Sequence, residues 1–336
     1  MLFTTRLQWY TFDMQDGYGR IINYLRVSVT DKCNLRCVYC MPPEGVERTP
    51  HDQILSFEET LRICAAAAGL GINKIKITGG EPLVRRGLAS FIHSLKHQRN
   101  IKTVTLTTNG LTLSDFLKEL LDAGLDAVNI SLDTLNNTCF RRITRSNDLQ
   151  KVIHSIEDAC KTQLTIKINC VPMRGVNEND IVPLAELARQ TEIIVRFIEL
   201  MPIGLGSDFS PIPQDEIFEQ LQSAFGVLTP SDEQFGNGPA AYYSAAGFIG
   251  KIGFISALSH NFCGMCNRLR LTGTGLLKPC LSSDAGIDLK AIIRDGGGDA
   301  EIADAIRAAV MAKPARHNFR SDNNQHKKKN MFRIGG

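Results

Sequence analysis

The stretch LRVSVTDKCNLRCVYC, residues 25–40, joins a short β-branched run to three closely spaced cysteines. The run LRVSV at residues 25–29 has the composition of a buried β-strand. Asn34 and the MPPEG sequence at residues 41–45 disfavour a regular helix after this run. The stretch therefore predicts a strand followed by a loop that carries Cys33, Cys37 and Cys40.

The β-branched run is the first of six that alternate with helix-length stretches. The other five are KIKIT at 74–78, TVTLT at 103–107, AVNISL at 127–132, TIKINCV at 165–171 and IIVRFIEL at 193–200. Ser56 and Glu59 have the spacing of a capping box, and Ser114 precedes an amphipathic segment that ends at Gly124. Because parallel strands need long crossover connections, the pattern predicts a parallel α/β sheet, either a six-unit partial barrel or a doubly wound sheet.

The unusual residues of the chain follow these predicted strands. They are the cysteines at 33–40, GGEP at 79–82, TTNG at 107–110, SLD at 131–133 and ELMP at 199–202. The carboxyl ends of parallel strands face a common mouth, where ligands bind in both architectures. We therefore expect one ligand chamber at this rim.

After about residue 210 the alternation loosens into segments rich in Pro, Gly and Asp. This predicts a barrel over residues 1–210 and an appended C-terminal region over residues 211–336, with its own cysteines and a flexible Gly-Gly tail.

The composition, with 43% hydrophobic and 22% charged residues among 336, is that of a globular protein with a large core. The first fifteen residues lack the apolar core of a signal peptide, and no run approaches the roughly 18 apolar residues of a membrane span. A net charge of +3, with a single basic run at 327–329, does not indicate a nucleic-acid binder. We expect a cytoplasmic protein with no nucleic-acid or membrane partner.

Ten cysteines in a chain of this length indicate metal binding more than disulfides, since the cytosol keeps thiols reduced. Four of them stand alone in helix-like or strand-like segments and are expected to be small core residues: Cys64, Cys139, Cys160 and Cys170.

The first cysteine set has the spacing Cys33-x3-Cys37-x2-Cys40. Structural zinc prefers four closed ligands, and His51 lies eleven residues beyond the last cysteine. An iron–sulfur cube held by three thiolates leaves one iron open for a ligand. The spacing favours iron–sulfur, with zinc and unligated thiols as the alternatives.

The second set consists of Cys263, Cys266 and Cys280, and His260 could complete a zinc site with them. On this chemistry zinc and iron–sulfur are equally favoured. Arg268 and Arg270, separated by one residue, would point to the same face of an extended segment. Because a guanidinium fork matches phosphate oxygens, the pair suits an anionic substrate beside an open metal position.

The first cysteine set, with Tyr39 before its last member, resembles the radical S-adenosylmethionine (SAM) superfamily, and GGEP resembles that superfamily's segment near the SAM amino group. The resemblance implies a 4Fe–4S cluster whose open iron chelates SAM. An electron passed to the sulfonium then releases a 5′-deoxyadenosyl radical.

Across nearly its full length the chain is similar to the MoaA-type GTP 3′,8-cyclases, which begin molybdenum cofactor biosynthesis. The matching segments are GRIINYLRVSVTDKCNLRCVYCMP, KITGGEPLVRRGL, LTTNG, NISLDTL, KINCV, ELMPIG, CGMCNRLRLT and the terminal IGG. The resemblance implies a partial (β/α)6 TIM-type radical SAM barrel, and a C-terminal subdomain carrying a second 4Fe–4S cluster whose open iron binds guanine.

The resemblance also assigns residues. The SAM contacts are Tyr39, Gly80, Ser131 and Met201. The GTP contacts are Arg26, Lys76, Thr107, Lys167, Arg268 and Arg270. The residues expected to be catalytic are Arg268, Arg270, Gly335 and Gly336. The family more often has arginine where this chain has Lys76. The lysine keeps the positive charge but cannot bind a phosphate in the bidentate geometry of a guanidinium.

The implied reaction takes a hydrogen from C3′ of the GTP ribose and joins C3′ to C8 of guanine, giving (8S)-3′,8-cyclo-7,8-dihydroguanosine 5′-triphosphate. By resemblance the partners are GTP, an external low-potential electron donor, a downstream cyclic pyranopterin monophosphate synthase, and a second copy in a homodimer. Two rival functions are another twin-cluster radical SAM enzyme, such as a peptide-modifying one, and a zinc-stabilised binding protein.

Overall fold

Six strands alternate with helices along the first part of the chain in the computed structural model, which describes residues 14–47, 49–319 and 331–334. The strands are β1 (Tyr24–Ser28), β2 (Lys74–Thr78), β3 (Thr103–Thr108), β4 (Ala127–Ser131), β5 (Thr165–Cys170) and β6 (Ile194–Ile198). All six pair in parallel and in chain order. The predicted six-unit alternation is confirmed.

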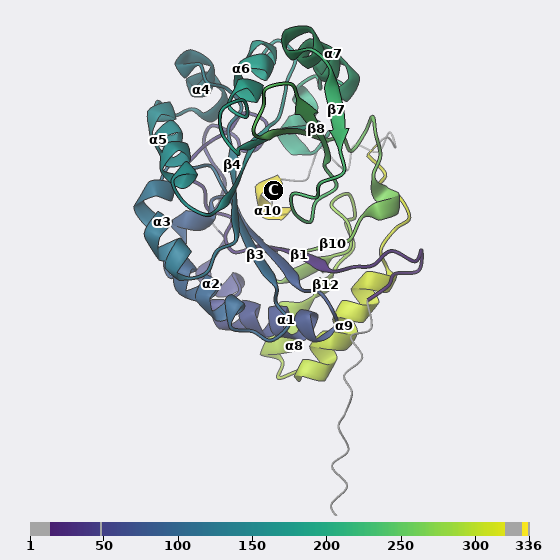
Figure 1. Ribbon diagram of the computed structural model, residues 1–336. Helices are drawn as coiled ribbons and strands as arrows, with labels where there is room; N and C mark the ends of the chain where they lie inside the picture. Colours follow the sequence, from purple (N-terminus) through teal and green to yellow (C-terminus); the bar gives the residue numbers. More distant parts are fainter. Residues whose placement is uncertain (1–13, 48, 320–330, 335–336) are drawn as a thin grey trace, which may run out of the picture.

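The helices between these strands cover the outside of the sheet, as Figure 1 shows. They are α1 (Phe57–Gly69), α2 (Leu88–Lys96), α3 (Leu113–Asp122), α4 (Asn137–Thr144), α5 (Leu149–Cys160), α6 (Ile181–Glu186) and, after β6, α7 (Gln214–Phe225). The sheet curves around a central space with these helices on its outer face only. A doubly wound sheet carries helices on both faces, so the fold is the partial barrel.

The C-terminal part of the chain extends this sheet at both edges. Next to β6 lie β9 (Lys251–Ile255), β8 (Ala241–Ala245) and β7 (Leu228–Ser231), while next to β1 lie β10 (Arg268–Leu271), β11 (Leu276–Lys278) and β12 (Ile287–Asp288). Both β9 and β10 are parallel to their barrel neighbours, so eight consecutive strands run parallel. The division into residues 1–210 and 211–336 stays a prediction, since both parts share one sheet.

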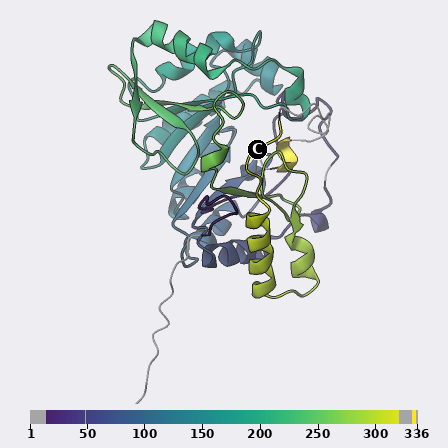
Figure 2. The same ribbon diagram turned by 90° about the vertical axis from the view of Figure 1, so that its right-hand side faces the viewer.

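Three further helices complete the described chain. α8 (Leu289–Arg294) and α9 (Asp299–Met311) pack on α1, at the opposite end of the molecule from α6 and α7 (Figure 2). α10 (Met331–Ile334) lies near the middle of the ring of strands in the view of Figure 1. The end of the described chain is thus brought to the central cavity, which Met331 and Phe332 line.

Alternation along each strand separates an apolar core from a polar interior. On β2, Ile75 and Ile77 are buried in the core shared with the outer helices, whereas Lys76 between them lines the inner cavity. On β1, Leu25 and Val27 flank Arg26 in the same way. Successive side chains of a strand point to opposite faces, so the apolar positions hold the barrel together while the polar positions face its interior.

The two predicted helix starts have different outcomes. At α1 the capping box is confirmed, because the Ser56 hydroxyl accepts from the Glu59 N–H at 3.1 Å and the Ser56 N–H donates to the Glu59 carboxylate at 2.7 Å. At α3 the prediction is wrong, since the helix begins at Leu113 and includes Ser114. The Ser114 hydroxyl instead donates to Asp158 of α5 at 2.9 Å, a tertiary partner that the local sequence does not reveal.

The four isolated cysteines also divide. Cys64 and Cys170 are buried, as expected of small core residues. Cys139 is only partly buried, and Cys160 is exposed, so the core interpretation is wrong for Cys160. Cys160 is the last residue of α5 and lies on its exposed side, whereas the preceding Ala159 is buried. None of the helices in the described ranges has the length and apolar character needed to cross a bilayer.

Replacing Ser56 by alanine should lower the free energy of unfolding by about 1 kcal/mol, because the first turn of α1 loses its side-chain acceptor. Urea unfolding of the purified protein measures this. Ser223→Ala is the matched control: that hydroxyl bonds only to the Glu219 carbonyl within α7, and its loss should change stability by less than about 0.5 kcal/mol. Equal losses in the two variants would contradict the capping role.

Candidate active site

One cavity of about 590 Å³ lies inside the curved sheet, and it gathers the predicted site residues. The six clustered cysteines line it: Cys33, Cys37, Cys40, Cys263, Cys266 and Cys280. So do the residues predicted for cofactor and substrate: Tyr39, Gly80, Ser131, Met201, Arg26, Lys76, Thr107, Lys167, Arg268 and Arg270. Gly335 and Gly336 lie outside the described residues.

The first cysteine loop is held by its neighbours on both sides. The N–H of Val38 donates to the Ile143 carbonyl of α4 at 2.9 Å. The Tyr39 hydroxyl donates to Asp133, just beyond β4, at 2.8 Å. These bonds fix the loop above the carboxyl ends of the strands. Burial raises the pKa of Cys40 to about 12 and that of Cys37 well above its usual range, so the thiols favour the neutral form without a cationic ligand.

The GGEP segment packs directly against this loop. The Gly80 N–H donates to the Thr30 carbonyl at 2.7 Å, and the Glu81 N–H donates to the Lys32 carbonyl at 2.8 Å. A Cβ on Gly80 would lie 2.3 Å from the Lys32 oxygen, so only glycine allows this approach. Burial raises the pKa of the Glu81 carboxyl to about 7, although backbone N–H groups and the Thr108 hydroxyl oppose the rise by donating to it.

The second cysteine loop is held by residues far away in sequence. The Arg20 guanidinium donates to the Cys263 carbonyl at 2.8 Å and to the Pro314 carbonyl at 2.8 Å, and it pairs with the buried Asp16 carboxylate at 2.5 Å. Glu199, just beyond β6, accepts from the Leu258 N–H at 2.6 Å. The second set of thiols is therefore attached both to the N-terminal segment and to the barrel rim.

A cationic environment surrounds the second set. Burial opposes ionisation of Cys266, but the charges of Arg268 and Lys313, with hydrogen bonds from Arg268, outweigh it and lower the pKa of this thiol to about 6. The Lys313 ammonium also donates to the carbonyls of Arg268 and Pro279, at 2.8 and 2.9 Å. A thiolate poised to bind metal is the expected result.

The arrangement of ligands disfavours a single zinc ion. His260, the candidate fourth ligand, is exposed and contacts Asp215 at 2.9 Å. Within residues 14–47, 49–319 and 331–334, no three or more His, Cys, Asp or Glu side chains are grouped to hold one metal ion. Each set instead offers three thiols at the cavity, the ligand number that leaves one iron of a 4Fe–4S cube without a protein ligand.

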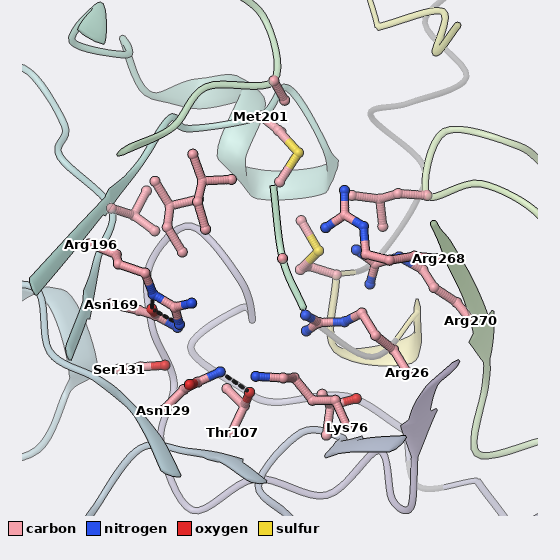
Figure 3. A pocket seen from close by; sticks show the side chains of 18 of the residues that line it. Arg26, Lys76, Thr107, Asn129, Ser131, Asn169, Arg196, Met201, Arg268 and Arg270 are labelled. Carbon is pink, nitrogen blue, oxygen red and sulfur yellow. Dashed lines mark hydrogen bonds between the residues drawn. The ribbon is translucent and has the colours of Figure 1, made fainter. Parts of the chain in front are cut away.

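Seven cationic side chains line the cavity: Arg26, Lys76, Lys167, Arg196, Arg268, Arg270 and Lys313. Arg270, Arg26 and Lys76 occupy directly paired positions on three neighbouring strands. Figure 3 shows Arg26, Arg268 and Arg270 on one side, with Arg196 facing them from the other. Like charges at paired positions are unfavourable, so this arrangement indicates a site for a polyanion.

The pKa values agree with this electrostatic picture. Burial, followed by the charges of Arg196, Arg26, Lys167 and Arg268, lowers the pKa of Lys76 far below its ordinary value. Burial and then Arg196 lower the pKa of Lys167 to about 7. The three acids that also line the cavity are bound by protein donors, since Asp126 pairs with Lys96, Asp133 accepts from Tyr39 and Glu199 accepts from backbone N–H groups. An anionic ligand would therefore restore the lysine charges.

The polar cavity residues that the sequence analysis missed include Asn129, Asn169 and Arg196 on the strands and Lys313 after α9. The Arg196 guanidinium donates to the Asn169 side-chain oxygen at 2.6 and 2.9 Å, so the two act as one unit across β5 and β6. Each of the three strand residues is a polar residue inside a buried strand, at the same alternation as Ser131 or Lys167. That alternation was the signal that could have identified them.

The end of the described chain also reaches this site. Met331 and Phe332 of α10 line the cavity, and the Phe332 N–H donates to the Cys40 thiol. The segment that leads to the predicted Gly335 and Gly336 therefore lies against the first cysteine loop.

Comparison with protein families gives two matches. The model of the Radical SAM superfamily matches residues 27–188, and the model described as Molybdenum Cofactor Synthesis C matches residues 193–319. Together they cover both cysteine sets.

Curated relatives match the chain over its length. The GTP 3′,8-cyclase of Desulforamulus reducens is 45% identical over 327 residues, covering 96% of this chain and 100% of the relative. The GTP 3′,8-cyclase of Heliobacterium modesticaldum is 47% identical over 328 residues with the same coverage, and that of Clostridium perfringens strain SM101 is 44% identical over 323 residues, also with that coverage.

Among solved structures, Streptococcus suis SuiB bound to S-adenosylmethionine matches with a TM-score of 0.59 at 14% identity, over 93% of this chain and 72% of that chain. SuiB bound to its precursor peptide SuiA matches with a TM-score of 0.57 at 14% identity, over 85% of this chain and 67% of that chain. At this identity the likeness concerns the fold alone.

Gly80→Ala should lower the free energy of unfolding by about 1–3 kcal/mol, because the new Cβ would push the first cysteine loop from β2. Gly69→Ala is the control: a Cβ there meets nothing within 4 Å at the end of α1, and the change should stabilise by about 0.5–1 kcal/mol. Thermal and urea unfolding of the two variants provide the comparison. A Gly80→Ala protein as stable as Gly69→Ala would refute the close-packing role.

Proposed function

The chain belongs to the GTP 3′,8-cyclase family, and we propose that its cavity holds two 4Fe–4S clusters, SAM and GTP together. The enzyme is a radical SAM protein of molybdenum cofactor biosynthesis that converts GTP to (8S)-3′,8-cyclo-7,8-dihydroguanosine 5′-triphosphate. The observation that carries the site assignment is the placement of two sets of three thiols in one cavity lined by seven cations.

The two thiol sets fit clusters that keep one iron open. Cys33, Cys37 and Cys40 would hold the first cluster, and Cys263, Cys266 and Cys280 the second. When bound, such clusters supply reducing electrons and a free coordination position beside the substrate. The protein contributes the cavity walls, and the lowered pKa of Cys266 keeps one ligand of the second set in the thiolate form.

SAM is assigned to the side of the cavity near the first cysteine set. Ser131 at the end of β4 and Met201 after β6 face the cavity from two directions (Figure 3). Gly80 lets the backbone approach without a side chain. The Tyr39 hydroxyl is already bound to Asp133, so this residue acts by holding the loop and by offering its ring and backbone.

GTP is assigned to the cationic side. Its triphosphate is a polyanion, and Arg26, Lys76, Lys167, Arg268 and Arg270 provide the opposite charge. Arg196 belongs with this group, because it faces the others across the cavity. Arg268 and Arg270 follow Cys266 closely in the chain and line the same cavity, which suits the catalytic role proposed for them. Lys76 acts as a point charge rather than a fork.

Exclusion of water is the remaining demand on the protein, because reactive intermediates attack whatever is near them. Met331 and Phe332 of α10 line the cavity, and α10 contacts the first cysteine loop through Phe332. We propose a catalytic role for Gly335 and Gly336, which lie outside the described residues, because residues without side chains suit a crowded position.

Several wider proposals rest on the same assignment. The enzyme acts in the cytoplasm, takes electrons from an external low-potential donor, and passes its product to a cyclic pyranopterin monophosphate synthase. It works as a homodimer in which residues 1–210 form the barrel and residues 211–336 the cluster- and substrate-binding region.

Anaerobic reconstitution should load about eight irons and eight sulfides per chain, and replacing all three cysteines of either set by serine should leave about four. Metal and acid-labile sulfide analysis measures this. Cys160→Ser is the matched control, because this thiol is exposed and lies outside the cavity, so it should keep the full content. Zinc at one or two equivalents without sulfide would refute the cluster assignment and support a zinc-binding protein.

GTP binding should weaken above neutral pH through Lys167. Its pKa is about 7 in the free protein because of burial and then Arg196, and a bound triphosphate raises that pKa. The charged interaction is therefore complete below pH 7 and is lost as pH rises through the pKa of the complex. Binding isotherms between pH 6 and 9 should show a steeper fall for the wild type than for Lys167→Arg, whose guanidinium stays charged. Identical profiles would contradict the contact.

A further inference from the structure

Asn129 occupies a position between the two proposed ligand groups. It is the third residue of β4, only 2% exposed, and it lines the cavity. At its level it pairs with Thr107 on β3 and Lys167 on β5, both assigned to GTP. Two residues further along the same face of β4 is Ser131, assigned to SAM.

The hydrogen bonds of this amide are incomplete. Its nitrogen donates to the Thr107 hydroxyl at 3.4 Å, a dashed contact in Figure 3, while its buried oxygen has no partner among the described residues. The neighbouring Asn169 contrasts with it, since the Asn169 oxygen accepts two bonds from Arg196. A buried polar atom without a partner is unfavourable, so the outer end of the Asn129 amide is expected to bind a ligand group.

We propose that Asn129 positions GTP by a hydrogen bond to a hydroxyl of its ribose, an inference that rests on the proposed function. The reaction takes a hydrogen from ribose C3′, so the ribose must lie where the SAM-facing and GTP-facing residues meet. Asn129 is at that boundary, with Ser131 above it and Lys167 beside it.

The chemistry of the ligand also favours a hydroxyl. Phosphate oxygens accept hydrogen bonds at neutral pH and cannot satisfy the amide oxygen, whereas a hydroxyl both donates and accepts. The guanine is assigned to the second cysteine set, next to β10, and three strands separate β10 from β4 in the sheet. The ribose is therefore the part of GTP that Asn129 can reach, and the bond would orient C3′ and select ribonucleotides.

Equilibrium binding to the anaerobically reconstituted protein, without reductant, tests this. The ligands are GTP, 2′-deoxy-GTP, 3′-deoxy-GTP and, separately, SAM. On the wild type one deoxy analogue should bind about tenfold more weakly than GTP. Asn129→Leu keeps the branched shape of the side chain and removes both polar atoms. In this variant GTP should bind as weakly as that analogue, and the ratio of the two dissociation constants should fall below about twofold. SAM affinity should stay unchanged.

Two further variants keep the test decisive. Thr105→Val removes a hydroxyl two residues before Thr107 on β3, and it should retain the wild-type ratio. If the leucine variant does not fold, Asn129→Ser takes its place, because it is a smaller change. It should also reduce the ratio between the dissociation constants of the deoxy analogue and GTP. A second readout is coupling: with reductant, Asn129→Leu should form more 5′-deoxyadenosine per cyclised product than the wild type, because C3′ is less well placed.

Three results would overturn the inference: equal binding of all three nucleotides by the wild type, a ratio that persists in Asn129→Leu, or a loss confined to SAM, which would assign the amide to the ribose of that ligand. A wild-type protein that carries both clusters and binds no GTP would instead refute the proposed function itself.

Discussion

The mutual repulsion of buried cations is the constraint on which the rest of this structure depends. Arg270, Arg26 and Lys76 lie at paired positions on adjacent strands, with Arg196 facing them, and Lys167 lines the same cavity. Each desolvated charge is unfavourable alone and more so beside its neighbours, as the lowered pKa values of Lys76 and Lys167 indicate. The barrel must therefore be held together from its outer, apolar face, and its interior stays a cavity that suits a polyanion.

The fold must also place two cysteine sets at the same cavity. Backbone pairing and buried hydrogen bonds do this. The parallel pairing of β10 with β1 brings residues near 268 beside residues near 24. Arg20 then binds the carbonyls of Cys263 and Pro314, so the N-terminal segment, the second loop and the chain after α9 form one unit. A guanidinium with a buried carboxylate partner can satisfy several carbonyls at once, which no apolar side chain can do.

Much of the site could be predicted because it consists of residues whose types and spacings carry chemistry. The residues singled out by the cysteine spacings, GGEP and the Arg268–Arg270 pair line one cavity, and the β-branched runs predicted the six strands. Asn129, Asn169 and Arg196 were missed because a polar residue within a strand has no local sign of the face to which it points. The predictions for Ser114 and Cys160 were wrong for a related reason. A partner on another helix decides the environment of Ser114, and the exposed side of α5 decides that of Cys160.

The sequence by itself determined the alternation of strands and helices, the two sets of thiols and the family, because these depend on local patterning and on residue identity. Only the tertiary structure decided that both edges of the sheet are extended by the C-terminal part, and that α10 lines the central cavity. It also decided that the cations share one interior and that the Asn129 oxygen has no partner in the part of the chain that the structure describes. The physical reason is that pairing register and burial are set by contacts between segments far apart in the chain, which local propensity does not encode.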